Sequence, residues 1–477
     1  MNRWKSGWIA LLLCAAPAAA RAGTISGVVK DINSGGGLSG VTISDGTHST
    51  TTGSTGSYAL AEAAGTYTLT ATRVSYLKTS LVVTVGSGTV TTNWALTPSY
   101  GTQVIPAASM QYVIFAWNDL GMHCDQDDYS YFMVLPPYNT MHAQVFHRGD
   151  GQPITSGITV SYSFPKKTNS TLHTNFWSYA AQYGFNVAPN VGITGTPLAG
   201  NMKLDANGLG FVAVGIPLTP YDDDGTWDPY GTGTITVKSS TGQVLQTATV
   251  VGPVSTEMMC VNCHSASNPQ LDILQRHDQH QGTTLASDQS KGIVHACSEC
   301  HPDNALGRAG KPGVESLSLA MHNFHKDKMA STSTALNTTP DCYNCHPGPK
   351  TQCMRGIMER AGKTCHDCHG DIYGVTNSLL AGRRDWLDEP KCGSCHDAKH
   401  AENTGTLYRN SVLKNAPDGD MNNRIYCEGC HNGTHGEFTT QVAADQSIPK
   451  KFQGDGYWIW SCTVCHSSGY GSGSMHH

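Results

Sequence analysis

Charged residues are scarce in this chain of 477 residues, because Asp, Glu, Lys and Arg together make up 14% of it, against about 25% in typical globular domains. Acidic residues outnumber basic ones by 36 to 30, and the net charge of −6 excludes the basic surface that a nucleic-acid-binding protein needs. Beyond the first residues, no apolar run is long enough to cross a bilayer. We therefore expect a mature chain that has no transmembrane segment and binds no nucleic acid.

The N-terminal residues have the composition of an export signal. Arg3 and Lys5 precede a short apolar stretch at 8–16, and Ala20-Arg21-Ala22 fits an A-x-A cleavage site. We predict that residues 1–22 are a signal peptide and that the protein is exported to the periplasm, the outer surface or the extracellular space.

Residues 23–98 are rich in Thr, Ser and Gly and contain short alternating runs separated by Gly/Ser clusters. Short strands at such regular spacing predict a small β-sandwich. The order of the runs Ile25–Val29, Leu38–Ile43, Gly56–Leu60 and Gly65–Leu69 resembles the carboxypeptidase regulatory-like domain, a seven-stranded, transthyretin-like sandwich. The resemblance implies a module for stability, spacing or adhesion that carries no chemistry.

Residues 99–255 also contain runs that are typical of strands. Val113–Trp117, Ile158–Phe164, Phe211–Val214 and Thr234–Val237 are rich in β-branched and aromatic residues, and loops with Gly, Pro and Asp separate them. We expect a second all-β, sandwich-like domain here.

Cysteine and histidine dominate residues 256–477, where strand alternation stops and aliphatic clusters are few. Fourteen of the seventeen cysteines lie here in one repeated pattern, Cys-x-x-Cys-His. The seven copies, each given by its two cysteines and its histidine, are Cys260, Cys263 and His264; Cys297, Cys300 and His301; Cys342, Cys345 and His346; Cys365, Cys368 and His369; Cys392, Cys395 and His396; Cys427, Cys430 and His431; and Cys462, Cys465 and His466.

This pattern is typical of c-type haem attachment. The two thiols form thioethers to the vinyl groups of one haem, and the adjacent histidine becomes the proximal ligand of the iron. Zinc ribbons also use paired cysteines, but zinc does not require a histidine directly after every second cysteine. We therefore predict seven covalently attached haem c groups in a mostly α/coil domain, where the haems supply the apolar bulk that the aliphatic residues do not.

Further histidines in this zone are candidates for the distal ligand of the iron. The distal candidates are His277, His280, His295, His322, His325, His366, His400 and His435. Counting close neighbours once, and adding His476 with His477, gives seven positions for seven irons, which predicts low-spin haems with two histidine ligands each. Six-coordinate iron has no open position for a substrate, so we expect an electron carrier rather than an enzyme.

Three cysteines lie outside the repeated pattern. Cys14 leaves lipidation of the signal segment open, although no small residue precedes it. Cys124 and Cys353 form either a disulfide between the second β domain and the haem zone or two unrelated thiols. The acidic residues around His123 and the run 222–224 are either cation sites or solvated turns, and His123 is one more candidate distal ligand.

The segment Cys342–His346, followed by Pro-Gly-Pro-Lys-Thr-Gln-Cys353 and then by Cys365–His369, resembles a segment of the outer-surface and periplasmic multihaem c-type cytochromes of metal-respiring bacteria. The resemblance implies a chain of haems that passes electrons toward extracellular acceptors such as metal oxides. We expect other cytochromes or quinol-oxidising proteins to be the electron donors.

Two other functions stay open at this point. One is a multihaem reductase of a small nitrogen or sulfur oxyanion, with one haem that lacks a sixth ligand. The other is the subunit of a conductive filament, which needs haems exposed at both ends. The many spare histidines favour the carrier over the reductase.

Overall fold

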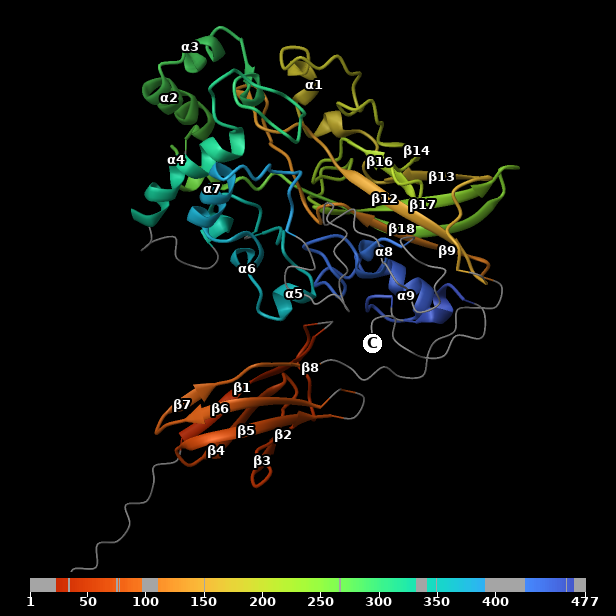
Figure 1. The fold of residues 1–477 in the computed structure, drawn as a ribbon, viewed down its shortest axis with the longest axis vertical. Helices are drawn as coiled ribbons and strands as arrows, with labels where there is room; N and C mark the ends of the chain where they lie inside the picture. Colours follow the sequence, from red (N-terminus) through yellow and green to blue (C-terminus); the bar gives the residue numbers. More distant parts are fainter. Residues whose placement is uncertain are drawn as a thin grey trace, which may run out of the picture. The chain divides into compact units, whose positions relative to one another are not determined.

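The computed structural model describes residues 23–32, 35–73, 76, 78–96, 110–149, 151–265, 267–331, 341–348, 350–390, 425–459 and 461–466. Contacts divide the chain into two units, Met1–Gly101 and Thr102–His477, which we describe separately. Sheets fill the first half of the chain and short helices follow, so the expected β-first, multidomain layout is confirmed (Figure 1).

The first unit is a sandwich of two four-stranded sheets. In one sheet β1 (Gly23–Asp31) pairs with β4 (Ser57–Glu62), β7 (Thr89–Thr91) and β8 (Trp94–Leu96), and the other has the order β3 (Ser49–Thr51), β2 (Thr42–Ser44), β5 (Gly65–Thr72), β6 (Thr79–Val85). Alternate residues turn inward, and Ile25, Val29, Leu69 and Trp94 lie in the core between the sheets. Eight strands are thus present where the family resemblance implies seven.

The second unit begins with another sandwich. Its five-stranded sheet has the order β10 (His123–Cys124), β18 (Val244–Ser255), β17 (Tyr230–Ser239), β13 (Ile158–Ser163), β14 (Ala199–Asn201), and its four-stranded sheet has the order β15 (Lys203–Leu204), β16 (Phe211–Val214), β12 (Thr140–His147), β9 (Tyr112–Asn118). A short parallel pair joins β11 (Phe132–Met133) to β19 (His295–Ala296). Apart from its first residue, β9 is buried at every position, so both of its faces are covered.

The helices of the second unit are short. Besides further short turns that carry cysteine motifs, the described helices include η1 (Ser170–Leu172), α1 (Phe176–Tyr179), α2 (Pro269–Gln281), α3 (Leu285–Gln289), α4 (Leu317–Ser331), α5 (Ile357–Arg360), α6 (Cys365–His369), α7 (Ile372–Leu380), α8 (Cys427–His431) and α9 (Ser447–Gln453). Local sequence sets the limits of α2: the Asn268 side chain accepts the Leu271 N–H, Pro269 begins the helix, and Gly282, with a φ of 67°, ends it. Within the described part of the chain, none of the helices combines the length and the apolar character that a membrane span requires.

The core of the second sandwich continues into the C-terminal segment. Val113 and Phe115 of β9 belong to one buried cluster with Ile425, Phe452 and Val464. Helices α8 and α9 lie against this side of the sandwich and cover the outer face of β9 (Figure 1). The cluster therefore crosses the domain boundary that we expected at residue 255.

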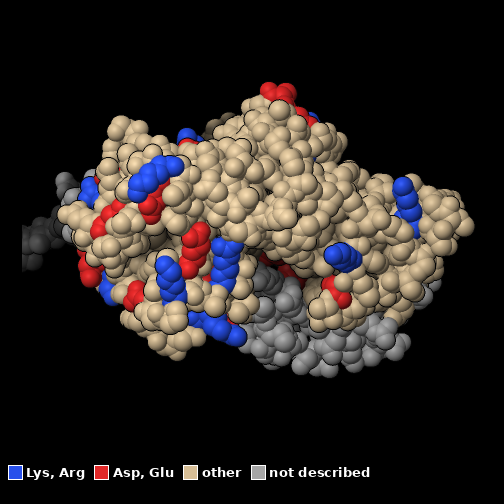
Figure 2. Space-filling view, turned by 90° about the horizontal axis from the view of Figure 1, so that it is seen from above, with Lys and Arg blue, Asp and Glu red and all other residues tan. Residues whose placement is uncertain are grey.

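The surface is as poor in charge as the sequence. On the face drawn in Figure 2, most residues are neither acidic nor basic, and acidic and basic side chains lie among one another. Exposed ion pairs such as Arg384 with Asp388, 2.7 Å apart, contribute little to stability because water screens them.

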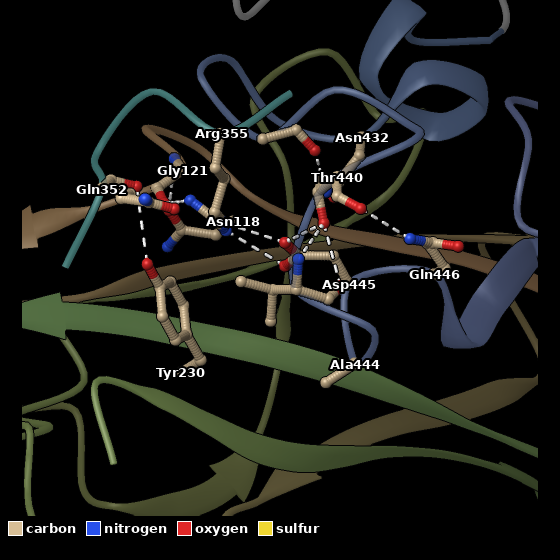
Figure 3. A network of polar contacts seen from close by, with 12 residues as sticks. Asn118, Gly121, Tyr230, Gln352, Arg355, Asn432, Thr440, Ala444, Asp445 and Gln446 are labelled. Carbon is tan, nitrogen blue, oxygen red and sulfur yellow. Dashed lines mark hydrogen bonds and ion pairs between the residues drawn. The ribbon is translucent and has the colours of Figure 1, made fainter. Parts of the chain in front are cut away.

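A buried ion pair joins the later segments to the sandwich. Arg355 is 1% exposed and donates to both carboxylate oxygens of Asp445, at 2.8 and 3.0 Å. Its guanidinium also donates to the Gly121 carbonyl and lies 5.0 Å from the centre of the Tyr230 ring (Figure 3). The Thr440 hydroxyl donates to the same carboxylate at 2.7 Å. This network provides both charged side chains with hydrogen-bonding partners. It also fixes the relative positions of four segments that are distant in the sequence.

We expect Arg355→Met to lower the free energy of unfolding by about 3–5 kcal/mol, because Asp445 is then left buried without its partner. Arg384→Met is the matched control, since the side chains of its ion pair are 62% and 37% exposed. It should cost far less than Arg355→Met, because water screens this exposed pair. Urea denaturation followed by circular dichroism measures both losses, and equal losses would contradict the role given to the network.

Candidate functional site

Each described Cys-x-x-Cys-His motif lies on a single helical turn. These turns are η2 (Met259–Asn262), η3 (Cys297–Glu299), η4 (Asp341–Asn344), α6, α8 and η7 (Cys462–Val464). In the first three motifs the carbonyl of the first cysteine accepts the backbone N–H of the histidine, at 2.9, 3.0 and 2.9 Å. The turn thereby brings two thiols and one imidazole together. The motif residues Cys392, Cys395 and His396, and the candidates His400, His476 and His477, lie outside the described residues.

Three motif histidines lie opposite predicted distal histidines. The distances between ring centres are 6.3 Å for His277 and His301, 6.2 Å for His322 and His346, and 6.2 Å for His369 and His435. The angles between the ring planes are 88°, 23° and 39°. The distance between the ring centres is therefore nearly the same in the three pairs, whereas the angle between the ring planes differs.

This separation fits a metal ion between two imidazole nitrogens. A metal–nitrogen bond of about 2.0–2.1 Å on each side, with roughly 1.1 Å from each nitrogen to its ring centre, puts the centres about 6.2–6.4 Å apart. Each ring can turn about the nitrogen–metal–nitrogen axis without changing this distance, which accommodates the three different angles. The residues therefore fit the iron of a haem with two histidine ligands.

Hydrogen bonds at Nδ1 orient most of these rings. The partners of Nδ1 are Thr283 Oγ1 at 2.9 Å for His277, the Glu315 carbonyl at 2.9 Å for His301, the Ser318 carbonyl at 2.7 Å for His322 and the Leu120 carbonyl at 2.9 Å for His435. A proton held at Nδ1 fixes the tautomer and makes Nε2 the nitrogen that is available to a metal.

Burial keeps two motif histidines in the neutral form that a metal requires. It lowers the pKa of His346 and that of His369 to about 4. His435 differs, because burial lowers its pKa but Cys353 and Glu437 outweigh burial and raise the pKa to about 10. A metal at Nε2 would take the place of the proton, and the same neighbours would then stabilise its positive charge.

A fourth pair is indicated by electrostatics. His325 on α4 lies near His264 of the first motif, and burial, followed by His264, lowers the pKa of His325. The Nδ1 atoms of both rings have partners, the Met321 carbonyl at 2.7 Å and Asp272 Oδ2 at 2.9 Å. These bonds leave Nε2 of each ring available to a metal, as in the other pairs.

The remaining described candidates have other surroundings. His280 on α2 packs edge-on against an aromatic ring of α4, with the ring centres 5.3 Å apart. His295 has Glu299 Oε2 at 2.9 Å from Nδ1 and Asp288 Oδ2 at 3.7 Å from Nε2, so carboxylates face both of its nitrogens. His366 lies inside α6, between the cysteines of its own motif.

The first, third and fourth motifs adjoin one another. The Met259 N–H donates to the Cys345 carbonyl at 3.5 Å, and burial, with the first-motif cysteines, raises the pKa of Cys345 to about 11. Cys365 of the fourth motif is hydrogen-bonded to Cys342 of the third, which lowers the pKa of Cys365 to about 6. Three attachment points therefore form one continuous group.

The sixth and seventh motifs are set into the core of the second sandwich. Their second cysteines are each 8% exposed and belong to its buried cluster. The indole of Trp458 lies 6.2 Å from the ring of His431, with 26° between the planes. A Cβ on Gly151 would lie 2.5 Å from the ring of His466, so the glycine allows the backbone to approach that ring. Sequence analysis missed Trp458 and Gly151, since neither stands in a recognisable motif.

The two spare cysteines of this unit are free thiols close to each other. No disulfide joins Cys124 to Cys353, so of the two alternatives the structure has two separate thiols. Burial first, and then Cys353, raises the pKa of Cys124 to about 12. The Cys353 sulfur lies 3.9 Å from Nδ1 of His435. The thiols therefore border the pair formed by His369 and His435.

The alternative cation sites are engaged in other contacts. Asp222 forms ion pairs with Lys166 and Lys167, at 3.3 and 3.4 Å. The Nε2 atom of His123 lies 2.7 Å from Asp119 Oδ1, so a carboxylate holds the nitrogen that a distal ligand would use. Asp222 and His123 therefore already have charged partners within the protein.

Burial raises the pKa of Asp125 to about 7 from its ordinary value of 3.8, although the Tyr129 hydroxyl donates to it at 2.5 Å. The folded state therefore keeps a proton that the unfolded chain loses above its ordinary pKa, and stability falls as the pH rises toward 7. As the pH rises from 5 to 7.5, the unaltered chain should lose about 2–3 kcal/mol of its free energy of unfolding, whereas Asp125→Asn should not. The stability of the variant relative to the unaltered chain should therefore rise over this pH range. Urea midpoints measure this gain, and a difference that does not vary with pH would contradict it.

Comparison with known proteins supports a multihaem cytochrome. No family model matches the chain. A probable tetraheme cytochrome c-type protein of Nitrosomonas europaea is 27% identical over 143 residues, and the match covers 25% of this chain and 58% of that protein, less than two thirds of its length. The likeness supports covalently bound haem c and electron transfer in general terms.

Solved structures offer only weak likenesses. DUF3823 family proteins from Bacteroides ovatus and Parabacteroides merdae are each 12% identical to the chain. The matches cover 48% and 49% of this chain and 98% of each of those proteins, with TM-scores of 0.14 and 0.15. Scores of this size define no common fold for the whole chain.

Proposed function

We propose that this protein is an exported c-type cytochrome that carries electrons through seven covalently attached haems, one at each motif. The observation that carries the proposal is the constant separation of 6.2–6.3 Å between three motif histidines and the histidines opposite them. Two imidazoles at this distance, one of them directly after a turn with two thiols, are the protein ligands that a six-coordinate haem c uses.

Each motif supplies three functional groups. Its two thiols would attach the porphyrin, and its histidine would be one ligand of the iron. His277, His322, His325 and His435 would each supply the second ligand at the motif whose histidine they face. Bound haem supplies reversible one-electron chemistry at its iron. A second histidine ligand would leave no position on the iron for a substrate, so these residues would restrict the site to electron transfer. Contact between the first, third and fourth motifs supports transfer between neighbouring groups, which short distances favour.

We place this carrier in respiration outside the cytoplasm, in the periplasm or on the outer surface. Its electron donors are other cytochromes or quinol-oxidising proteins, and its acceptors are extracellular metal oxides or other terminal acceptors. The signal composition of residues 1–22 and the resemblance of the segment 342–369 support this placement. The first sandwich acts as a docking module in this scheme.

A multihaem reductase is the second candidate function. The indole of Trp458 lies 6.2 Å from the ring of His431 in the sixth motif, and an indole nitrogen is a donor that offers no lone pair to a metal. His435, four residues after His431 and a candidate for a neighbouring haem, lies opposite His369. An iron with a single histidine ligand, at any motif, would admit a small oxyanion.

We expect seven haems per chain, one for each motif. A pyridine haemochrome assay and iron analysis of the full-length protein should both give this ratio. Replacing Cys392 and Cys395 with alanine should lower the ratio by one. A count of four in the unaltered protein would contradict the assignment of one haem to each motif.

Removing a distal histidine should open one iron to carbon monoxide. We expect His277→Ala, His322→Ala and His435→Ala each to add a carbon monoxide-dependent absorption change of about one haem in seven to the reduced protein. His295→Ala is the matched control and should add none, since carboxylates face both of its nitrogens. If none of the three variants adds a change, the pairing is wrong.

The same carbon monoxide experiment on the unaltered protein distinguishes the electron carrier from the reductase. An absorption spectrum that carbon monoxide leaves unchanged supports the carrier. A change equal to one haem favours the reductase, and nitrite, hydroxylamine and sulfur oxyanions are then the substrates to assay.

A further inference from the structure

We propose that the first sandwich contains a binding site for a divalent transition metal of the zinc class, formed by Asp45, His48 and Glu62. One ligand atom from each residue lies within 4.8 Å of the other two. Asp45 and His48 belong to the hairpin between β2 and β3, and Glu62 ends β4, a strand of the other sheet (Figure 1). The site therefore bridges the two sheets and is independent of the proposed haem function.

Glu62 supplies the observation that points to a ligand. Its side chain is 1% exposed, and its Oε2 lies 3.0 Å from Nδ1 of His48, but its Oε1 has no hydrogen-bond partner. A buried carboxylate oxygen without a partner is costly, and a cation beside the carboxylate removes that cost. Glu62 also continues the inward-facing row of Tyr58 and Leu60, where an apolar residue is the rule.

The hairpin loop is organised before any ion binds. Asp45 Oδ1 accepts the N–H groups of Thr47 and His48, at 2.7 and 2.6 Å. The Ser44 hydroxyl donates to the His48 carbonyl at 2.8 Å, and Gly46 provides the φ of 97° that the turn needs. These bonds engage Oδ1 and leave Oδ2 of Asp45 on the side of the imidazole, 3.7 Å from Nδ1.

The distances suit a small tetrahedral ion. With metal–ligand bonds of about 2.0–2.2 Å, neighbouring ligand atoms of a tetrahedral site lie about 3.4 Å apart. The two measured separations from Nδ1 of His48, 3.0 and 3.7 Å, bracket this value. Two carboxylates neutralise a divalent ion, and the imidazole ligand favours zinc over calcium and magnesium, which prefer oxygen ligands. The His48 side chain is 59% exposed, so water can take the fourth position.

The test uses the full-length, haem-loaded protein, stripped with a chelator and then dialysed against micromolar zinc chloride. Mass spectrometry of the elements gives zinc and iron in the same sample. We expect Glu62→Gln and His48→Asn each to bind one zinc fewer than the unaltered protein. Asp31→Asn, in the same sandwich and hydrogen-bonded to Tyr76, is the matched control and should keep the zinc.

Calorimetry provides a second measurement. Zinc at about a hundred times its dissociation constant should raise the unfolding midpoint of the first unit by on the order of 10 °C, because the ion links the two sheets. The rise should be lost in His48→Asn. The His48 side chain is exposed, so its replacement should leave the fold of the first unit intact. If this variant binds as much zinc as the unaltered protein and shows the same rise, the proposal is wrong, whatever the haem content.

Discussion

The buried pair of Arg355 and Asp445 determines where one candidate haem ligand stands. The backbone N–H of Arg355 donates to the His435 carbonyl at 2.7 Å, while the His435 ring donates to the carbonyl of Leu120, the neighbour of Gly121. Arg355 thus connects the sandwich, the segment before the fourth motif and the loop that carries the His435 imidazole. Since an unpaired charge in this place costs several kcal/mol, the ion pair and the position of the ring are set together.

Patterns that act within one turn of chain could be predicted from the sequence. The spacing of the Cys-x-x-Cys-His motifs indicated thiols and imidazole on a common turn, and the alternation in residues 23–255 indicated strands, because both follow from local backbone geometry. Pairing between distant residues could not be predicted. His435 lies four residues after His431, yet it meets His369, since tertiary contacts of Arg355 decide where its loop goes.

Sequence analysis missed other sites for the same reason, namely that they form through contacts between distant residues. His48 is a lone histidine in a Thr-rich stretch, and its two acidic neighbours come from a turn and from a strand of the opposite sheet. The signal that could have found them is Glu62, a carboxylate in an inward position of an alternating strand. Trp458 likewise meets His431 only because the C-terminal segment folds back onto β9, which composition alone does not reveal.

The core shared by β9 and the C-terminal segment has a consequence for the order in which the protein matures. Val113 emerges more than three hundred residues before Val464, yet both end in one buried cluster. The sandwich cannot complete its packing while the last part of the chain is still being made, so an apolar face stays uncovered for most of synthesis and export. Because the second cysteines of the sixth and seventh motifs lie in that cluster, the proposed attachment of haem to these thiols would have to precede the final closure of the domain.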